Sequence, residues 1–391
     1  MTTKRIGITW PLSDGAGWGV FGMNLTIQLL NRSGPNPLLL SPPNIGQCPQ
    51  WLKEALEPLV AEQQALMAQI QNVGRQATLN DVVVLHALGN MFAPGQVSQM
   101  VTGEKNVGFI FFEDTGFDED ALNRARQFDR MMVGSTWNHQ VLTGLGLENV
   151  ACVLQGIDDQ IFHPGPRTGM FGDRFVVFSG GKLEFRKAQD IVLAAFRIFH
   201  ERHPEALLVA AWHNPWPESA RSMEASPHAK SAPAIDGNGE LLVAEWIREF
   251  GIPDDAVVHV GWASNLQMPR LLREAHVGLF PNRCEGGTNL VAMEAMACGV
   301  PCILSANTGH LDLIRDGICY PLSDQIPCKC ENDATGGWGE SSVEEAVEQL
   351  EKVYAERSKA ELCGRLGADF LKTLSWRNQT IKLLDAVSDM A

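Results

Sequence analysis

The 391-residue sequence is short of positive charge: 31 Lys and Arg stand against 46 Asp and Glu, a formal net charge of −15 at pH 7. This balance argues against nucleic acid as a main partner, because nucleic-acid-binding proteins present basic surfaces to phosphate. It also weakens the case for a broad basic face on an anionic membrane, while leaving peripheral membrane contact open.

Long apolar runs and a disulfide framework are missing as well. No apolar run reaches the roughly 18 residues that a membrane-spanning helix needs. The first ten residues lead directly into a predicted strand, so we expect no signal peptide. Nine cysteines are an odd number in a long chain, which indicates free thiols in a reducing compartment. We therefore expect a cytoplasmic protein.

Both halves of the chain alternate predicted strands and helices, which is typical of parallel sheets built from βαβ units. Pro164, Gly165 and Pro166 form a linker between the halves. The sequence thus predicts an α/β protein with two Rossmann-like domains, residues 1–165 and 166–372, followed by a last segment, 373–391. Two such domains that face each other would place the carboxyl ends of their strands on a central cleft, where ligands bind.

The most informative stretch is CEGGTNLVAMEAMACGVPCI, residues 284–303. It predicts a strand, a Gly-rich loop, a helix and a strand, and such a loop aims backbone N–H groups and a helix dipole at one point, which suits a diphosphate. The loop and the helix start contain Gly286, Gly287, Thr288, Asn289 and Leu290. Glu285 and Glu294 flank this point, and carboxylates should bind hydroxyls rather than phosphate. Phosphate together with hydroxyls suggests a nucleotide sugar.

Glu-Gly followed by Glu-Ala-Met-Ala-x-Gly-x-Pro resembles the signature of the retaining glycosyltransferases of family 4, which have the GT-B fold. Eight residues separate Glu285 from Glu294, where the family has seven. The segment NLVAME is similar to the corresponding segment of trehalose-phosphate synthases, which are close relatives in fold. The resemblance implies a donor in the second domain, an acceptor in the first, and a last helix that crosses back after Trp376. It also implies that Glu294 binds the ribose, that Glu285 binds the sugar, and that Trp262 borders the base.

The segment SGGKLEFRKAQD, residues 179–190, resembles the family's Gly-Arg-Leu…Lys-Gly segment. Lys182 stands where an arginine is usual, Lys187 matches the lysine, and Ala188 replaces the glycine. We expect both lysines to stabilise the leaving diphosphate, which gains negative charge as it departs. Taken alone, two lysines near a helix start would be solvated surface residues.

Gly17, Gly19 and Gly22 form GxGxxG between a predicted strand and a helix from about Val20. The pattern fits a dinucleotide site, a tight strand-to-helix turn, or the loop that closes over the donor phosphates, as the resemblance implies. No acidic residue follows between Arg32 and Leu40, which disfavours a dehydrogenase.

Two further residues follow predicted strands of the first half. Many relatives place a histidine near the end of strand 107–112, where this chain has Glu113, which either contacts the donor sugar or only caps and pairs locally. His86 ends another strand and is either a structural histidine or a catalytic one.

Metal signals are weak. Asp118, Glu119 and Asp120 have the DxD form of metal-dependent glycosyltransferases, but acidic residues in a first helical turn are ordinary dipole partners. Cys328 and Cys330 form a CxC without a second pair, so two free thiols are the simpler interpretation than zinc. We expect no metal and no cofactor.

The sequence therefore predicts a metal-independent, retaining glycosyltransferase that moves a sugar from a nucleoside diphosphate sugar to a hydroxyl of an unknown sugar, lipid-linked or protein acceptor. The resemblance implies attack from the leaving-group face, since no Asp or Glu has an evident nucleophile role. The alternatives are a non-catalytic nucleotide-sugar-binding protein and a sugar-nucleotide epimerase or phosphorylase of the same fold.

Overall fold

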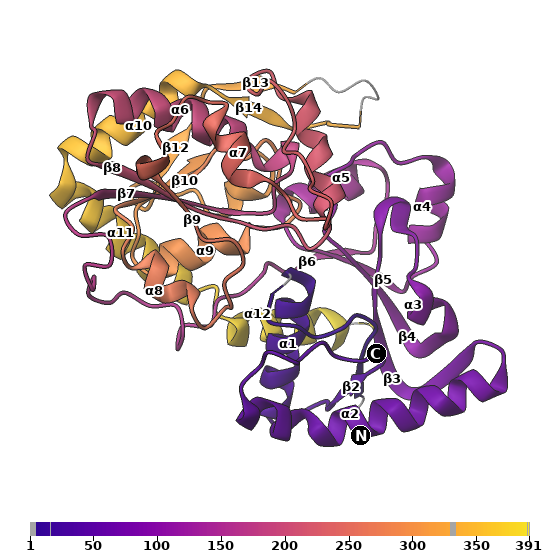
Figure 1. Ribbon diagram of the computed structural model, residues 1–391. Helices are drawn as coiled ribbons and strands as arrows, with labels where there is room; N and C mark the ends of the chain where they lie inside the picture. Colours follow the sequence, from indigo (N-terminus) through magenta and orange to yellow (C-terminus); the bar gives the residue numbers. More distant parts are fainter. Residues whose placement is uncertain (1–4, 16, 329–333, 389, 391) are drawn as a thin grey trace. The chain divides into compact units, whose positions relative to one another are not determined.

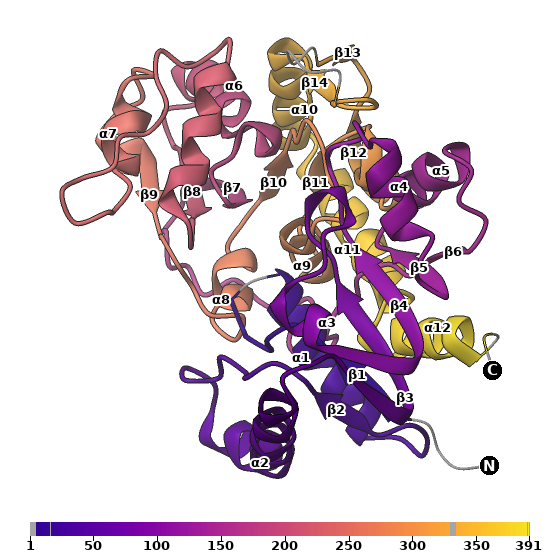
Figure 2. The same ribbon diagram turned by 90° about the vertical axis from the view of Figure 1, so that its right-hand side faces the viewer.

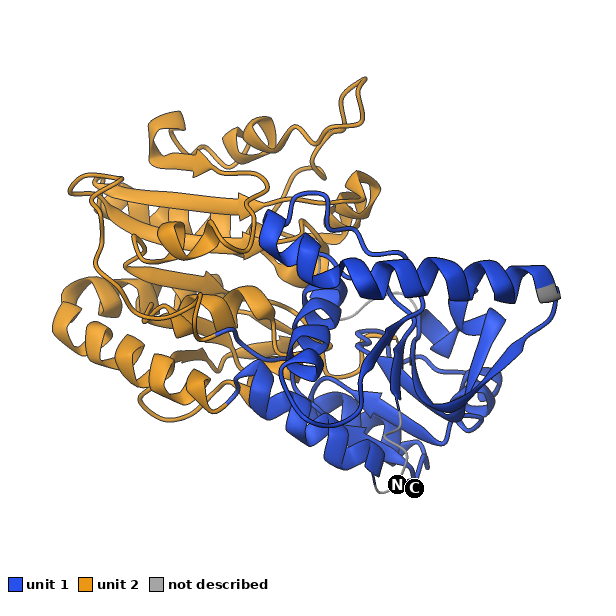
Figure 3. Cartoon of the chain, turned by 90° about the horizontal axis from the view of Figure 1, so that it is seen from below, with its two compact units in different colours: residues 1–158, 374–391 blue, residues 159–373 orange. Residues whose placement is uncertain are grey.

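The computed structural model describes residues 5–15, 17–328, 334–388 and 390. The chain forms two compact units, residues 1–158 with 374–391 and residues 159–373 (Figure 3). Each unit has one six-stranded sheet in which every neighbouring pair of strands is parallel. The two parallel sheets with their connecting helices confirm the predicted α/β class.

The sheet of the first unit has the order β2-β1-β3-β4-β5-β6, and its neighbouring strands β3, β4 and β5 are labelled in Figure 1. Its strands are β1 (Arg5–Ile8), β2 (Pro37–Leu39), β3 (Ala77–Ala87), β4 (Val101–Ile110), β5 (Arg130–Val133) and β6 (Val150–Cys152). The helices and 3-10 turns of this unit are α1 (Gly17–Leu30), α2 (Gln50–Val73), η1 (Asn90–Phe92), α3 (Gln96–Met100), α4 (Glu119–Ala125), α5 (Thr136–Gly144) and α12 (Trp376–Ser388).

The last helix, α12, packs in the first unit, as the resemblance implies. The backbone N–H of Trp376 donates to the carbonyl of Ile157 at 3.0 Å, and the N–H of Ile157 donates to Leu374 at 2.9 Å. The Trp376 ring lies 5.3 Å from the ring of Phe21 in α1. A side chain at Gly156 would overlap the Trp376 indole, so this crossing depends on a glycine.

The sheet of the second unit has the order β12-β11-β10-β7-β8-β9 (Figure 2). Its strands are β7 (Phe175–Gly181), β8 (Ala206–Trp212), β9 (Val257–His259), β10 (Val277–Phe280), β11 (Cys302–Ser305) and β12 (Tyr320–Leu322), and β13 (Gln325–Pro327) and β14 (Gly339–Ser341) form a separate antiparallel hairpin. The helices and 3-10 turns are η2 (Phe185–Lys187), α6 (Gln189–Arg202), η3 (Pro217–Ala225), α7 (Val243–Arg248), η4 (Asp254–Ala256), α8 (Met268–Leu272), α9 (Leu290–Ala297), η5 (Thr308–Asp312), α10 (Val343–Ala355) and α11 (Arg357–Lys372).

The central strands of the second unit are apolar because helices cover both of their faces (Figure 2). Every residue of β10 and β11 is buried. Phe196 and Phe199 of α6 are completely buried in the same core. This packing fixes the carboxyl ends of β7, β10 and β11, from which the candidate site is built.

One local expectation differs from the structure. Gly17 and Gly19 lie inside the first turn of α1 rather than in the preceding loop. A side chain at Gly19 would strike Ser13, and one at Gly22 would strike the Trp10 indole, so close packing accounts for both glycines. Among the described residues, no helix is both long and apolar enough to cross a membrane.

Candidate functional site

Three segments of the second unit meet at the carboxyl edge of its sheet. They follow β7, β10 and β11, which are neighbours in the sheet, so parallel pairing brings their ends together. The N–H of Cys284 after β10 donates to the carbonyl of Arg186 after β7, at 3.2 Å. The N–H of Gly309 after β11 donates to the carbonyl of Glu285 at 3.0 Å. Residues more than 90 positions apart in sequence thus form one site.

Glu285 is the centre of this site. Its carboxylate accepts from Lys187 Nζ at 2.5 Å, from the Arg186 guanidinium at 3.4 Å, and from the side-chain amide of Asn282. Burial would raise the pKa of Glu285, but the charges of Lys187 and Arg186 hold that pKa below its usual range. Burial lowers the pKa of Lys187, against the opposing pull of Glu285. Glu285 is therefore an ionised carboxylate.

A second carboxylate, Glu184, extends the chain of charges. It pairs with Lys182 Nζ at 2.9 Å and with the Arg186 guanidinium at 2.9 Å. We call these five residues, Lys182, Glu184, Arg186, Lys187 and Glu285, the cationic cluster; three cations against two carboxylates give it a net charge of +1. The structure thus joins both predicted lysines to Glu285, but Lys182 reaches it only through Glu184 and Arg186. Sequence patterns singled out Lys182 and Lys187 and missed Arg186.

Buried Arg283 braces the turn that carries Arg186 and Lys187. Its side chain is completely buried, donates two hydrogen bonds to Asp190 at 2.9 and 2.7 Å, and donates to Glu340 at 2.9 Å. It also donates to the carbonyl of Phe185 at 2.8 Å, and its backbone N–H donates to the carbonyl of Arg186 at 2.8 Å. The backbone of η2 is therefore held by groups other than its own charged side chains.

The Gly-rich loop between β10 and α9 is buried from Gly286 to Asn289. Within the described part of the chain, the N–H groups of Gly287 and Thr288 donate to no protein acceptor. Asn289 has φ +60° and caps α9 by accepting from the N–H of Ala292 at 3.4 Å, and Leu290 starts the helix. A side chain at Gly309 would overlap the Gly287 carbonyl, so the loop path requires glycine there. Unpaired N–H groups beside a helix start form a cradle for an anion.

His310 supports this loop as a neutral imidazole. The Ser305 hydroxyl donates to the carbonyl of Asn282 at 2.6 Å, so it accepts from His310 Nδ1–H at 2.9 Å. The other ring nitrogen, Nε2, then accepts from the Asn289 side chain at 3.0 Å. Burial lowers the pKa of His310 to about 4. No pattern in the sequence indicated this histidine, because its partners are set by the fold.

Glu294 lies in α9 and is buried, in an environment unlike that of Glu285. The side chain of Asn265 donates to it at 3.0 Å. Burial raises the pKa of Glu294 to about 8, and the Asn265 hydrogen bond offsets this only in part. Glu294 is therefore protonated at neutral pH in the free protein. Trp262, which follows β9 at the same edge of the sheet, is 40% exposed.

The remaining candidates of the first half lie in the first unit. Glu113 follows the end of β4 and is half-buried, and its suggested contact with the donor stays a prediction. His86 is a buried residue of β3 whose Nε2 lies 2.9 Å from the Asn106 side chain. Burial lowers the pKa of His86, which fits a structural histidine.

The other metal candidates have local roles or lie outside the described residues. Asp118 caps α4 by accepting from the N–H of Ala121 at 2.7 Å, and Glu119 pairs with Arg126 at 2.6 Å. Cys328 Sγ lies 4.0 Å from Glu340 Oε2, and Cys330 lies outside the described residues. Among the described residues, no group of three or more His, Cys, Asp or Glu side chains is arranged to hold a metal.

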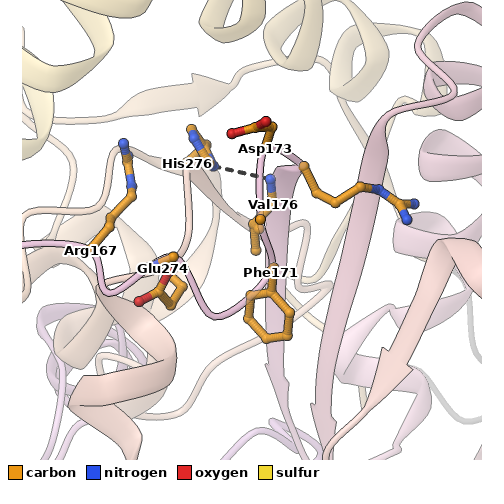
Figure 4. Close-up of a pocket in the computed structure, with 9 residues that line it drawn as sticks. Arg167, Phe171, Asp173, Val176, Glu274 and His276 are labelled. Atoms are coloured by element: carbon orange, nitrogen blue, oxygen red, sulfur yellow. Dashed lines mark hydrogen bonds between the residues drawn. The ribbon is translucent and has the colours of Figure 1, made fainter.

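A pocket of about 260 Å³ lies at the opposite, amino-terminal edge of the same sheet, where β7 and β10 begin (Figure 4). His276, next to β10, accepts from the N–H of Val176 at 3.1 Å, and Glu274 accepts from the N–H of Thr168 at 2.5 Å. This pocket contains none of the residues of the cationic cluster or of the Gly-rich loop.

The second unit matches a known protein family. Residues 166–368, just over half of the chain, match the family described as glycosyl transferases group 1. D-inositol 3-phosphate glycosyltransferase of Mycobacterium tuberculosis is 27% identical over 249 residues, which are 62% of this chain and 44% of the relative. The chain therefore spans less than half the length of this curated relative.

Solved structures show the same fold over nearly the whole chain. Sucrose-phosphate synthase from Thermosynechococcus elongatus has a TM-score of 0.67 at 15% identity and covers 99% of both chains. Anabaena HepE in complex with UDP-glucose has a TM-score of 0.66 at 12% identity and covers 99% of this chain and 100% of its own. With the two parallel sheets and the returning α12, these likenesses confirm the predicted GT-B fold.

Proposed function

This chain belongs to the glycosyl transferases group 1 family, and we propose that it transfers the sugar of a nucleoside diphosphate sugar to an acceptor hydroxyl with retention of configuration. The observation that carries the proposal is the ion pair of Glu285 and Lys187, 2.5 Å apart, beside a Gly-rich loop with unpaired N–H groups. This arrangement combines a hydroxyl acceptor, a cation and an anion cradle, which are the three elements that a nucleotide sugar requires.

The proposed roles follow from the chemistry of each group. Glu294 binds the ribose hydroxyls, and Glu285 binds a hydroxyl of the transferred sugar. Lys187 and the N–H groups of Gly287 and Thr288 stabilise the leaving diphosphate, whose negative charge grows as the glycosidic bond breaks. Trp262 borders the nucleobase.

Retention is proposed to proceed by attack from the leaving-group face. The acceptor hydroxyl attacks the anomeric carbon on the side of the departing diphosphate, and a phosphate oxygen of the donor takes its proton. We assign no enzyme nucleophile, because Glu285 is held in its ion pair with Lys187. We also propose that catalysis needs no divalent ion, since Lys187, its neighbouring cations and the start of α9 supply positive charge at the diphosphate.

UDP-glucose is the first donor to test, because HepE was solved in complex with UDP-glucose and with UDP. A thermal-shift screen of nucleoside diphosphates and their sugars identifies the base, and a ligand at 100 times its dissociation constant should stabilise the protein by roughly 2.7 kcal/mol. The matching donor is then incubated with candidate acceptors. Acceptor-dependent release of nucleoside diphosphate supports a transferase, whereas binding without turnover shows a nucleotide-sugar-binding protein.

Two amide variants separate the roles of the glutamates. Glu294→Gln should weaken the donor and the bare nucleoside diphosphate alike, because both carry the ribose. Glu285→Gln should weaken the donor more than the diphosphate, because only the donor carries the sugar. Calorimetry with both ligands measures the difference, and equal losses in Glu285→Gln contradict the assignment of Glu285 to the sugar.

A further inference from the structure

Arg186 is the second cation in contact with Glu285. Its guanidinium lies 3.4 Å from one carboxylate oxygen of Glu285, while Lys187 occupies the other oxygen at 2.5 Å. Lys182 instead forms its ion pair with Glu184 at 2.9 Å. The side chain of Arg186 is 15% exposed against 36% for Lys182, so Arg186 is also the more desolvated of the two.

The backbone of Arg186 is held in place by hydrogen bonds that do not involve its side chain. The N–H groups of Arg283 and Cys284 both donate to its carbonyl, at 2.8 and 3.2 Å. Glu184 on one side and Glu285 on the other then orient the guanidinium. A planar guanidinium held in this way presents several N–H donors in a fixed fork, which matches two phosphate oxygens, whereas lysine offers only a point charge.

We propose that Arg186 contacts the diphosphate of the donor directly and acts with Lys187 as the second cation on the leaving group. This inference rests on the proposed function and adds a residue to it. Lys182 keeps its pairing with Glu184 and is linked to the diphosphate only through Glu184 and Arg186. Charges in partly desolvated positions act more strongly on a bound anion than charges that water screens.

The chain supplies a matched control for this inference. Arg186→Gln and Lys182→Gln each remove one positive charge from the cationic cluster and one ion pair with Glu184. The two variants therefore have the same net charge, but only Arg186→Gln also removes a contact with Glu285. Arg186→Lys keeps the positive charge and removes only the planar set of guanidinium N–H donors.

The test measures binding of UDP, GDP and ADP, each with its monophosphate, by calorimetry on the full chain. Arg186→Gln should weaken the diphosphate that binds wild type by about 10- to 100-fold, as expected for a lost charge-assisted hydrogen bond. Lys182→Gln should weaken it by no more than about fivefold. The preference for the diphosphate over its monophosphate should shrink in Arg186→Gln and persist in Lys182→Gln, and Arg186→Lys should recover part of the loss.

Each other outcome overturns the inference in a recognisable way. Wild-type diphosphate affinity in Arg186→Gln, together with a loss in Lys187→Ala, overturns the role of Arg186 and leaves the proposed function intact. Equal losses in Arg186→Gln and Lys182→Gln show an effect of net charge alone and overturn direct contact. Failure of wild type to bind any of the three diphosphates overturns both the inference and the proposed donor.

Discussion

Glu294→Gln should become increasingly more stable than wild type as the pH rises, even though the substitution removes the group proposed to bind the ribose. Burial raises the pKa of Glu294 to about 8 from an ordinary value of 4.5. Between these values the unfolded chain loses its proton and the folded protein keeps it, so folding stability falls with rising pH. Glutamine does not titrate, and Glu294→Gln therefore lacks this loss.

The size of the effect follows from the width of the pH window. A difference of one pH unit inside the window corresponds to about 1.4 kcal/mol. From pH 5 to pH 8 the stability of Glu294→Gln relative to wild type should thus increase by roughly 4 kcal/mol. For a structural unit of the size of residues 159–373, this stability difference corresponds to a shift of Tm on the order of 10 °C. The extra N–H of the amide adds an offset that does not depend on pH, so the slope is the diagnostic quantity.

Thermal unfolding of wild type and Glu294→Gln at pH 5, 6, 7 and 8 measures this slope directly. Other titrating groups are common to both proteins and cancel in the difference. The expected result is a gap that widens with pH and levels off above about pH 8. A gap that changes by less than about 1 kcal/mol over this range would show that Glu294 is already ionised in the folded protein, and the assignment of a neutral carboxyl would then be wrong.

Three further predictions concern the diphosphate cradle. Lys187→Ala should lower kcat by about 10²–10³ with a smaller effect on donor affinity, and near wild-type turnover in a variant with an intact circular dichroism spectrum contradicts the placement of the diphosphate. Gly309→Ala should displace the Gly287 carbonyl, destabilise the protein by about 1–3 kcal/mol and weaken diphosphate binding, whereas Gly237→Ala, where the added methyl meets open space, should change neither. Turnover should persist in EDTA; activity that disappears and returns with Mn²⁺ or Mg²⁺ refutes metal independence.

The fold was largely predictable because strand–helix alternation is a local property of the sequence. Glu285, Glu294 and Lys187 were also recognisable, since each lies in a short motif around a predicted loop and helix. Arg186 was harder to recognise, because its importance depends on Glu285, 99 positions away. His310 likewise became visible only when the fold placed it between Ser305 and Asn289.

Close packing explains the glycine pattern that the sequence could not interpret uniquely. Three interpretations of Gly17, Gly19 and Gly22 were open, and the missing acidic residue after the helix disfavoured only the dinucleotide site. In the structure, Gly19 and Gly22 are needed because α1 packs tightly against Ser13 and Trp10. Side-chain packing between an element and the loop before it depends on coordinates, so sequence alone could not rank a packing reason above a ligand reason.

The protonation of Glu294 and the charge of the cationic cluster serve the same end. A diphosphate carries more than one negative charge, and the cationic cluster proposed to bind it has a net charge of only +1, because Glu184 and Glu285 offset two of its three cations. An ionised Glu294 in the helix that starts at the Gly-rich loop would add a third carboxylate and repel the same anion. Burial keeps Glu294 neutral, so the ribose contact proposed for it would not oppose the proposed diphosphate.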